Sequence, residues 1–594
     1  MNSSRQRVDI SRVASIAALA IALLIVALLL WRTWQSAQFS AGIFGYPFQV
    51  DESEGMIAAE TLLLDQGQNI YNFPGPQQFV AAPYPPLYYL LNLPLIHFTG
   101  YSLKVGRTLT ILSTLAAAAL LFALVKLATR RRLAAIIAAL AFLASSLTAF
   151  WGAIVKPDLP AMAFALLGLY LVALSIVGQQ GGPPPAPTNA GSVPVQHRDP
   201  NSQFTIHNST FAALAVAAFA LAMLTKQTSV AAAGAGFVVL LFSDWRRGLK
   251  AIGLYVAIVG GVSLLLDGQT AGGYFWHIVT VHTLPWNFDR LVSYVQTIWS
   301  VNWPLILMGA LGLIVAIASA IRGTSQRIRF NGETGKTDVG AQFIAPVPPI
   351  PNQGVIYHAP TEPNQGVINH APTNIQNSKL AFMLLLYALA AVVQASGVGT
   401  LGGVHNHFLD ALSALCIGFG LLLGWLLDRA NDVGSALPLR VAGLIGLCVA
   451  AVLVWLLIGA EYDPHDLNAY QFRLPSAAQL EGMSNIAQFA TNNGGPLYSD
   501  NVSIVLSAHQ RLRSTDPYTQ THASSPAIHP NPADRWDERQ LVADIRAGKF
   551  ALIILAPSDP CKGGGGEVSP AIAAAVCDSY KLIQRNVEYI YQPR

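Results

Sequence analysis

Long apolar stretches recur along most of the chain and stop near residue 460. Each approaches the roughly 20 residues that an α-helix needs to cross the hydrocarbon core of a bilayer. They predict about eleven transmembrane helices, near 13–31, 105–128, 133–150, 159–177, 209–225, 228–243, 250–267, 303–321, 380–397, 408–427 and 440–459. Several are rich in Ala, Gly and Ser, as expected where membrane helices pack closely. The pattern predicts an α-helical polytopic membrane domain over residues 1–460.

From residue 461 the pattern becomes that of a soluble domain, which we place at 461–594. The run 550–555 is continuously apolar and typical of a buried strand. Predicted helices cover 476–491, 502–509 and 536–547, and further predicted strands cover 496–500, 580–585 and 587–591. The sequence therefore predicts a small C-terminal α/β domain.

The segment 33–104, between the first two spans, is a long semi-apolar loop. Residues 51–65 predict a short amphipathic helix, and the prolines in 83–86 interrupt any helix that follows. The apolar run 87–98 is too short for a standard span, so we predict a helix in the membrane interface; a hairpin dipping into the bilayer is the alternative. In the interfacial arrangement Tyr84, Tyr88 and Tyr89 lie at headgroup depth.

Composition agrees with a membrane protein. Of the 594 residues, 53% are hydrophobic and only 11% are charged, against about 25% charged in soluble proteins. The net charge of +4 is dispersed, and no basic stripe with interleaved aromatics indicates a nucleic-acid partner. The first apolar run follows Arg5, Arg7 and Arg12 like a secretory signal, but it is longer and no cleavage site follows. We therefore expect a retained first helix.

Basic residues predict the orientation. They gather in alternate connections, as Arg130, Arg131 and Arg132; Arg246, Arg247 and Lys250; Arg322, Arg327 and Arg329; and Arg429 and Arg440. Because such clusters stay in the cytoplasm, the N-terminus is expected there too. An odd number of spans then makes the C-terminal domain extracytoplasmic. The expected location is the cell (plasma or inner) membrane.

Two low-complexity inserts, 179–208 and 323–378, fall on the predicted cytoplasmic face. The second contains a tandem duplication, in which 351–362 recurs almost unchanged over 363–374. Such Pro-, Asn-, Gln- and Gly-rich segments cannot bury a core.

Four cysteines do not make a disulfide-rich scaffold. Cys561 and Cys577 both lie in the C-terminal domain and could pair in an oxidising compartment. Two unrelated thiols remain the alternative.

Three acids, Asp51, Glu52 and Glu54, stand just after the first span. Ionisable groups beside a bilayer indicate a functional site. A hydroxyl nucleophile needs a nearby carboxylate base, for which Asp51 is the candidate, with Glu52 positioning sugar or acceptor hydroxyls. The alternative for this pair is a solvated helix N-terminus.

Cations near the same face could stabilise a leaving phosphate. The candidates are Lys226, Arg107 and Lys156, and for each the alternative is a side chain that snorkels to the interface. Further candidate substrate-binding residues are Asp158, Tyr84, Tyr88, His405, Asn406 and Asp410. No cofactor is required by the spacing; a divalent cation held by Asp51, Asp158 and His405 is kept open.

Several motifs in this order resemble GT-C fold glycosyltransferases of the family 39 type, which include bacterial aminoarabinose transferases and protein O-mannosyltransferases. They are Asp51-Glu52, residues 84–91, Lys156-Pro157-Asp158, residues 224–228 and residues 406–410. The resemblance covers about 13–460. It implies a polyprenyl-phosphate-sugar donor, an inverting transfer outside the cytoplasm and an acidic catalytic residue at Asp51. His407 departs from the pattern, since an aromatic such as Tyr is common there.

The sequence thus favours a membrane glycosyltransferase whose acceptor is a glycan, a lipid or a protein. A transporter or flippase of lipid-linked glycans is one alternative, but it normally places ionisable groups at mid-membrane and shows repeated helices. A non-catalytic membrane scaffold with an external binding domain is the other. It gives no reason for the clustered acids or the Pro-rich loop.

Overall fold

The computed structural model describes residues 3–177, 200–334, 373–431, 437–460, 466–467, 472–556, 560–562, 568–585 and 587–594. Within them, eight helices are long and apolar enough to cross a membrane, and three shorter apolar helices lie in the same bundle. The eleven are α1 (Ser3–Gly45), α4 (Leu103–Thr129), α5 (Arg132–Ala144), α7 (Asp158–Val177), α8 (Pro200–Thr225), α9 (Ala231–Ser243), α10 (Trp245–Gln269), α12 (Phe288–Thr334), α13 (Thr373–Ala395), α14 (Leu409–Asn431) and α15 (Leu437–Ala460). Each corresponds to one predicted span, so the polytopic helical fold is confirmed.

Several helix limits differ from the prediction. The helix α1 continues to Gly45, well past the apolar run, while the predicted span 133–150 divides into α5 and the short α6 (Ser146–Trp151). The helices α8 and α12 extend into the predicted inserts, up to Pro200 and Thr334 respectively. Residues 179–199 and 335–372 of these inserts lie outside the described residues, as does the tandem duplication up to residue 372.

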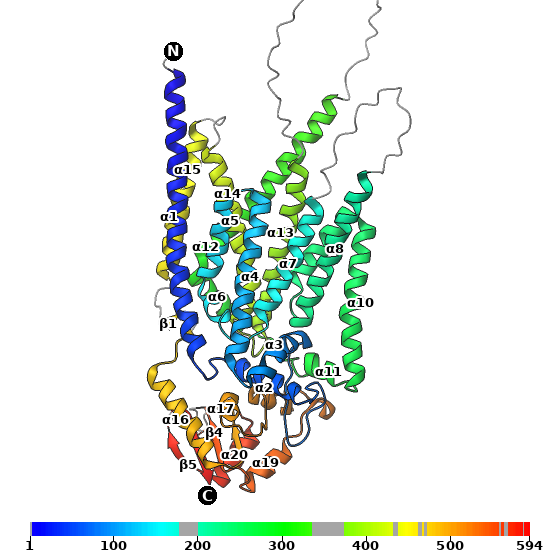
Figure 1. Ribbon diagram of the computed structural model, residues 1–594, viewed down its shortest axis with the longest axis vertical. Coiled ribbons are helices and arrows are strands. Elements are labelled where there is room, and N and C mark those ends of the chain that lie inside the picture. Colours follow the sequence, from blue (N-terminus) through cyan, green and yellow to red (C-terminus); the bar gives the residue numbers. More distant parts are fainter. Residues whose placement is uncertain are drawn as a thin grey trace, which may run out of the picture.

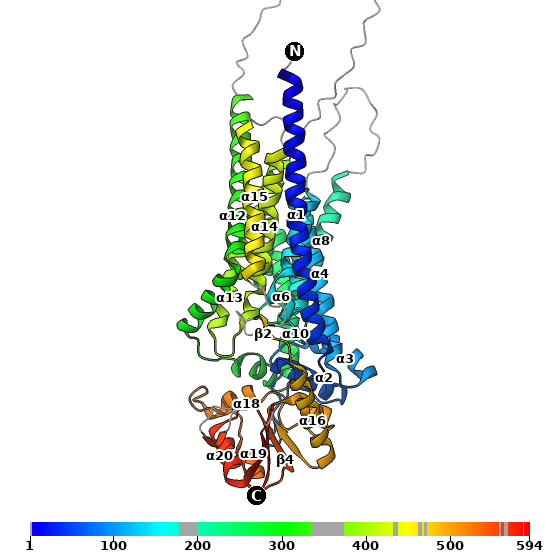
Figure 2. The same cartoon turned by 90° about the vertical axis from the view of Figure 1, so that its left-hand side faces the viewer.

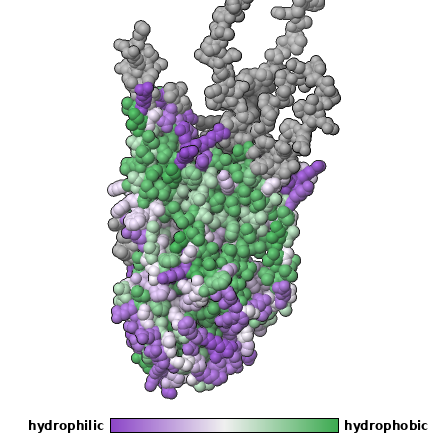
Figure 3. All heavy atoms as spheres, in the orientation of Figure 1, coloured by the Kyte–Doolittle hydropathy of each residue, from purple (hydrophilic) through white to green (hydrophobic). Residues whose placement is uncertain are grey.

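The helices form one elongated bundle with a polar domain at one end (Figure 1). The N-terminus lies at the far end of the bundle, and the two views agree that the C-terminal domain and the first loop lie together at the other (Figure 2). An apolar band covers the bundle surface between two polar ends (Figure 3). Such a band is what a multi-pass membrane protein presents to lipid.

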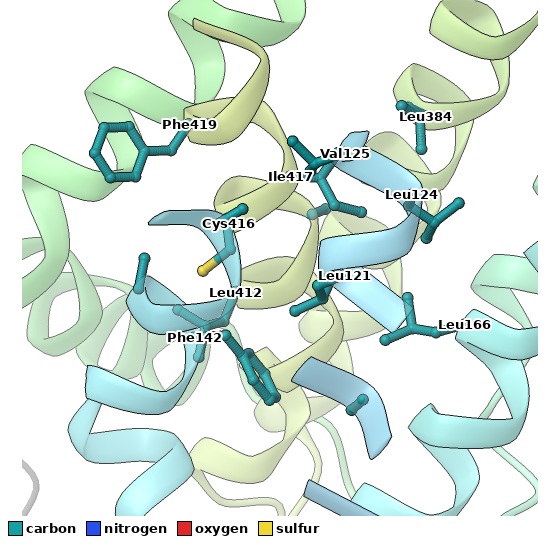
Figure 4. Close-up of a cluster of buried hydrophobic side chains, with 14 of the residues drawn as sticks. Leu121, Leu124, Val125, Phe142, Leu166, Leu384, Leu412, Cys416, Ile417 and Phe419 are labelled. Atoms are coloured by element: carbon teal, nitrogen blue, oxygen red, sulfur yellow. The ribbon is translucent and has the colours of Figure 1, made fainter. Parts of the chain in front are cut away.

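The centre of the bundle is apolar. Side chains of α4, α5, α7, α13 and α14 meet around the buried thiol of Cys416 (Figure 4). At one crossing a Cβ on Gly312 would lie 1.8 Å from the carbonyl oxygen of Gly418, so only glycine permits this approach of α12 to α14. The prediction that small residues bring these helices close together is confirmed.

The first loop folds into two helices, α2 (Glu52–Asp65) and α3 (Pro86–Thr99). Both helices were predicted, but α2 is buried along most of its length rather than amphipathic. The side chains of Tyr88 and Tyr89 are fully buried within the protein, so the prediction that they lie at headgroup depth is wrong. The C-terminal domain covers this loop, which the apolar pattern alone could not reveal.

The C-terminal domain contains a four-stranded mixed sheet of order β3-β4-β6-β5. Strands β3 (Leu497–Ser499) and β4 (Leu552–Leu555) are parallel; β6 (Tyr589–Pro593) is antiparallel to both β4 and β5 (Tyr580–Arg585). The helices of the domain are α16 (Ala477–Asn493), α17 (Val502–Ser507), α18 (Pro517–Ser524), α19 (Arg539–Arg546) and α20 (Pro570–Ser579). The predicted α/β domain is thus present, with α18 and α20 unpredicted.

The first loop and the C-terminal domain share one hydrophobic core. It joins Phe79 and Tyr89 of the loop to Tyr498 and Trp536 of the domain. Backbone bonds support the packing, because Phe79 donates to the carbonyl of Arg513 and its own carbonyl accepts from Thr515. The polar end is therefore one packed unit made from two distant parts of the sequence.

Cys561 and Cys577 form a disulfide that ties the short helix η7 (Pro560–Lys562) to α20. Of the two alternatives for these thiols, the structure has the paired one.

Candidate functional site

Asp51 is the N-cap of α2. Its Oδ1 accepts hydrogen bonds from the backbone N–H of Ser53, at 3.0 Å, and from the Ser53 hydroxyl. An aspartate there satisfies an otherwise unpaired N–H of the first turn. Its side chain remains 22% exposed, more than those of Lys156, Asp158 and Lys226. Glu52 follows it on an exposed face of the first turn.

Lys156 approaches Asp51 from the connection between α6 and α7. Its Nζ lies 3.3 Å from Asp51 Oδ1 and 4.4 Å from the ring centroid of Trp151, a cation–π arrangement. Among the described residues, Asp51 Oδ2 has no protein partner. The site thus presents a carboxylate oxygen beside a fixed ammonium group.

Glu54 and Arg107 form a fully buried ion pair that fixes this geometry. The guanidinium donates to both oxygens of Glu54, at 2.7 and 2.8 Å. Its three remaining N–H groups donate to the carbonyls of Ile43, Tyr46 and Phe48. All five donors of Arg107 are therefore used within the protein. This leaves none for a substrate phosphate and favours a positioning role.

The same carboxylate also holds the segment that carries Lys156. Glu54 Oε1 accepts from the backbone N–H of Val155, at 3.0 Å, and Oε2 accepts from that of Val50, at 2.8 Å. Val50 and Val155 adjoin Asp51 and Lys156 in the sequence, so one buried acid sets the distance between the two candidate groups.

A second ion pair, of Asp158 with Lys226, lies two residues after Lys156 in the chain. Asp158, at the start of α7, accepts from Lys226 at 2.5 Å and from the Asn406 amide at 2.8 Å, both through Oδ1. Lys226 stands in the turn between α8 and α9, and Asn406 in the short helix η4 (His405–Phe408). Three separate connections therefore converge on one carboxylate.

The Pro-rich loop closes over this pair. Gln227 donates from Nε2 to the carbonyl of Pro83 at 2.8 Å, which fixes the loop against the turn that carries Lys226. Burial raises the pKa of the Tyr84 hydroxyl well above its ordinary value, and the nearby carboxylates of Asp158 and Asp51 raise it further. Tyr84 is thus a neutral hydroxyl between the two ion pairs.

Three other candidates have partners of their own. The hydroxyl of Tyr88 lies 3.2 Å from that of Thr110 inside the protein. The ring of His405 packs against Tyr294, with centroids 4.6 Å apart. Asp410 accepts from Tyr387 at 3.1 Å and from Gln394 at 2.5 Å. These contacts favour supporting roles for Tyr88 and Asp410.

Two buried acids of α2 carry more of the structure than the sequence indicated. Glu54 was recognised as part of the acidic cluster but not as its anchor. Glu60 accepts from Ala82 N–H, Tyr89 Oη and Thr515 Oγ1, at 2.7 to 2.9 Å, and burial raises its pKa to about 7. Asp51, Glu54 and Glu60 recur at intervals of three and six residues in this segment, which was the available signal. Apart from Val50, the partners of Glu54 and Glu60 lie 22 to 455 residues away in the sequence, where no local pattern identifies them.

The carboxylates are neutralised by lysines. Within the described residues, no group of three or more His, Cys, Asp and Glu side chains is arranged to hold a metal ion. The described residues do not bring Asp51, Asp158 and His405 together as one set of ligands, and the first two are paired with Lys156 and Lys226.

Solved structures were compared with this fold. No family model and no curated protein matches the chain. ArnT from Cupriavidus metallidurans matches with a TM-score of 0.52 and 12% identity when bound to undecaprenyl phosphate, over 96% of this chain and 97% of that one. Its apo state matches with a TM-score of 0.51 and 14% identity, over 97% and 98%. The chain has a GT-C fold. The oligosaccharyltransferase AglB from Archaeoglobus fulgidus has a TM-score of 0.48 and 11% identity, over 96% of this chain and 74% of that one.

The GT-C fold confirms the resemblance drawn from the ordered motifs. At this level of identity the likeness extends to the fold alone, and the chemistry has to be argued from the side chains.

Proposed function

We propose that this protein is a membrane glycosyltransferase that moves a sugar from a polyprenyl-phosphate donor to an acceptor. The observation that carries the proposal is Asp51, whose Oδ2 is open while Oδ1 faces Lys156. A base and two lysines stand at the end of an apolar bundle, where a lipid phosphate would meet them. The solved GT-C neighbour bound to undecaprenyl phosphate supports this kind of donor.

In the proposed step, the acceptor hydroxyl gives its proton to Asp51. The acceptor oxygen forms a bond to the anomeric carbon as the bond from that carbon to the phosphate oxygen breaks. The electron pair leaves with the polyprenyl phosphate, and attack opposite the leaving group inverts the anomeric centre. A positioned carboxylate base typically contributes about 10²–10⁴-fold to such a rate.

Lys156 and Lys226 are the proposed contacts of the leaving phosphate. Each is paired with a carboxylate in this structure, which holds its ammonium group near the proposed reacting atoms. A phosphate that approaches Lys156 would draw the ammonium group away from Asp51 and leave the carboxylate more basic. Donor binding and activation of the base are thereby coupled.

The polar end with the C-terminal domain is the proposed extracytoplasmic face. The Cys561–Cys577 disulfide supports this orientation, because disulfides persist in oxidising compartments. The basic clusters of the opposite end support a cytoplasmic N-terminus. The acceptor would then approach Asp51 beneath the C-terminal domain, close to the point where Gln49 bonds to Ser503.

The transporter alternative is less well supported. It requires polar groups along a path through the bundle, whereas the centre of the bundle is the apolar cluster around Cys416 (Figure 4). The proposed site lies at the bundle end instead.

Asp51→Asn tests the proposal directly. Asparagine is as good an N-cap as aspartate, so the fold should survive while transfer falls about 10²–10⁴-fold. Purified protein in liposomes would be offered a panel of radiolabelled polyprenyl-phosphate sugars, and loss of label from the lipid would be measured. Glu52→Gln in the same assay tests whether Glu52 positions a hydroxyl of the sugar or the acceptor.

Asp65→Asn is the matched control. It makes the same change at the other end of α2, where Asp65 pairs with His97 on the surface, and it should leave transfer unchanged. Turnover retained by Asp51→Asn, or a wild-type protein that consumes no sugar of the panel, would overturn the proposal.

A further inference from the structure

Three hydrogen-bond acceptors have no partner among the described residues: one on Asp158, one on its contact Asn406 and one on Gln227, the residue after Lys226. They are Asp158 Oδ2, Asn406 Oδ1 and Gln227 Oε1. Asp158 and Asn406 are 6% and 7% exposed. A buried acceptor without a partner is unfavourable, so a group of three calls for donors from outside the chain.

The orientation of both amides is fixed by their other bonds. The Nδ2 of Asn406 donates to the Asp158 carboxylate, at 2.8 Å, and Nε2 of Gln227 donates to the carbonyl of Pro83, at 2.8 Å. The Asp158 carboxylate and the Pro83 carbonyl have no hydrogen to donate to an amide oxygen. The oxygen and nitrogen of neither amide can therefore be exchanged. Both unpaired atoms are therefore oxygens, and the set contains acceptors only.

An unpaired buried amide is not by itself a site. Asn92 also has an unpaired Oδ1 while its Nδ2 donates to the carbonyl of Tyr88. What distinguishes the cluster is its position: Asp158 contacts Lys226 and, through the adjacent Lys156, neighbours Asp51. The unpaired acceptors therefore adjoin the proposed reaction centre.

We propose that Asp158, Asn406 and Gln227 form the subsite for the donor sugar, and that it selects a glycosyl group that presents hydrogen-bond donors and carries no carboxylate. Each sugar hydroxyl donates one hydrogen bond, which is what the three oxygens need. The inference rests on the proposed function and adds the class of sugar. A uronic acid is excluded, because its carboxylate would face the Asp158 carboxylate and two amide oxygens without a donor to share.

Binding rather than turnover tests the subsite. Affinities of the protein in detergent would be measured by calorimetry for farnesyl phosphate, for farnesyl phosphates carrying neutral hexoses and pentoses, and for one carrying glucuronic acid. At least one neutral sugar should bind about 10-fold or more tighter than farnesyl phosphate. Glucuronic acid should give no such gain.

Asn406→Leu and Gln227→Met remove one acceptor each at similar volume. Each should reduce the gain from the sugar by about 3- to 10-fold, as expected for one hydrogen bond, with a smaller effect on farnesyl phosphate itself. Asn92→Leu is the matched control, since it also deletes an amide that donates to a backbone carbonyl. It should leave the gain unchanged.

The outcomes separate the two proposals. The subsite is wrong, and the glycosyltransferase proposal stands, if farnesyl phosphate binds but no neutral sugar adds affinity. The same follows if the glucuronic acid ligand binds as well as a neutral-sugar ligand. It also follows if the variants weaken farnesyl phosphate and its sugar-bearing forms equally. If farnesyl phosphate itself fails to bind the wild type, both are wrong.

Discussion

Two buried ion pairs at the same end of the bundle differ in how fully their hydrogen bonds are used. In the pair of Arg107 and Glu54, every guanidinium N–H has a protein acceptor, and both carboxylate oxygens accept. In the pair of Lys226 and Asp158, one carboxylate oxygen remains unpaired. We call the first the closed pair and the second the open pair.

Burial alone does not separate the two, because both carboxylates are almost inaccessible, at 0% and 4%. The number of unused donors and acceptors does separate them. A saturated buried pair can only hold the fold, whereas an unsaturated one keeps capacity for a ligand. This difference is the basis of the proposed roles, which are positioning for Glu54 and Arg107 and substrate contact for Asp158 and Lys226.

Breaking the closed pair should have the largest effect on stability. Arg107→Met leaves Glu54 as an uncompensated buried charge, which typically costs about 3–5 kcal/mol. Thermal unfolding in detergent should show a large drop in the melting temperature. Arg131→Met is the control, because Arg131 pairs with Asp428 in an exposed bridge, worth less than about 1 kcal/mol. Equal drops for the two variants would contradict the assignment.

A second buried acid, Glu60, should make the stability of the polar end depend on pH. Burial raises its pKa from 4.5 to about 7, so the folded state keeps a proton that the unfolded state loses. Stability from Glu60 is complete below pH 4.5 and is lost as the pH rises to about 7. The difference between these pKa values is worth about 3 kcal/mol.

Glu60→Gln should abolish that dependence. The melting temperature of the wild type should fall relative to the variant between pH 5 and 7, measured in parallel. The groups that face Glu60 are Tyr89 of α3, Thr515 and Asp516 beside α18, and the Ala82 N–H of the loop. Asp516 is the other acid there, and burial raises its pKa too; a pH dependence that survives in Glu60→Gln would assign the effect to Asp516.

The closed and open pairs also show what the sequence could predict. Lys226 was the first candidate for a phosphate contact, with Arg107 and Lys156 after it, and each is a lone cation near a span end. The apolar periodicity predicted where their helices lie, and hence that they meet at one end. It could not predict which of their N–H groups are used, because the acceptors of Arg107 are carbonyls of the chain from Ile43 to Phe48.

The same limit explains the burial of α3. Tyr88 and Tyr89 have the composition of an interfacial helix, but Tyr88 contacts Thr110 of α4 and Tyr89 contacts Glu60 of α2, within the core that the loop shares with the C-terminal domain. That core joins parts of the chain more than 400 residues apart, as the backbone bonds of Phe79 with Arg513 and Thr515 show. Local pattern predicts an element, while its environment depends on partners from elsewhere in the chain.

Removing both members of the open pair should separate catalysis from folding. A purely structural buried pair can often be replaced by apolar or neutral groups at little cost. We therefore expect Lys226→Met combined with Asp158→Asn to keep its melting temperature and to lose transfer about 10- to 100-fold, the usual worth of a hydrogen bond to a charged group. Transfer at the wild-type rate would make the open pair structural as well.

The smallest effect is expected one step removed from the open pair, at Gln394. Its Oε1 accepts from the N–H groups of Val230 and Ala231, at 3.4 and 3.2 Å, and its Nε2 donates to Asp410. It thereby holds the start of α9 and the turn that carries Lys226. Asp410 would act on the substrate through this link and through its charge near Lys226.

Gln394→Ala should therefore loosen Lys226 without touching the substrate. Binding lost equally in the ground and transition states raises KM and leaves kcat unchanged, so we expect KM for the lipid donor to rise about 3- to 10-fold. Asn431→Ala is the control, because its amide bonds only to Leu427 within α14. A fall in kcat at constant KM would mean that Gln394 and Asp410 act in the chemical step. The reaction centre would then include residues beyond the open pair and its unpaired oxygens.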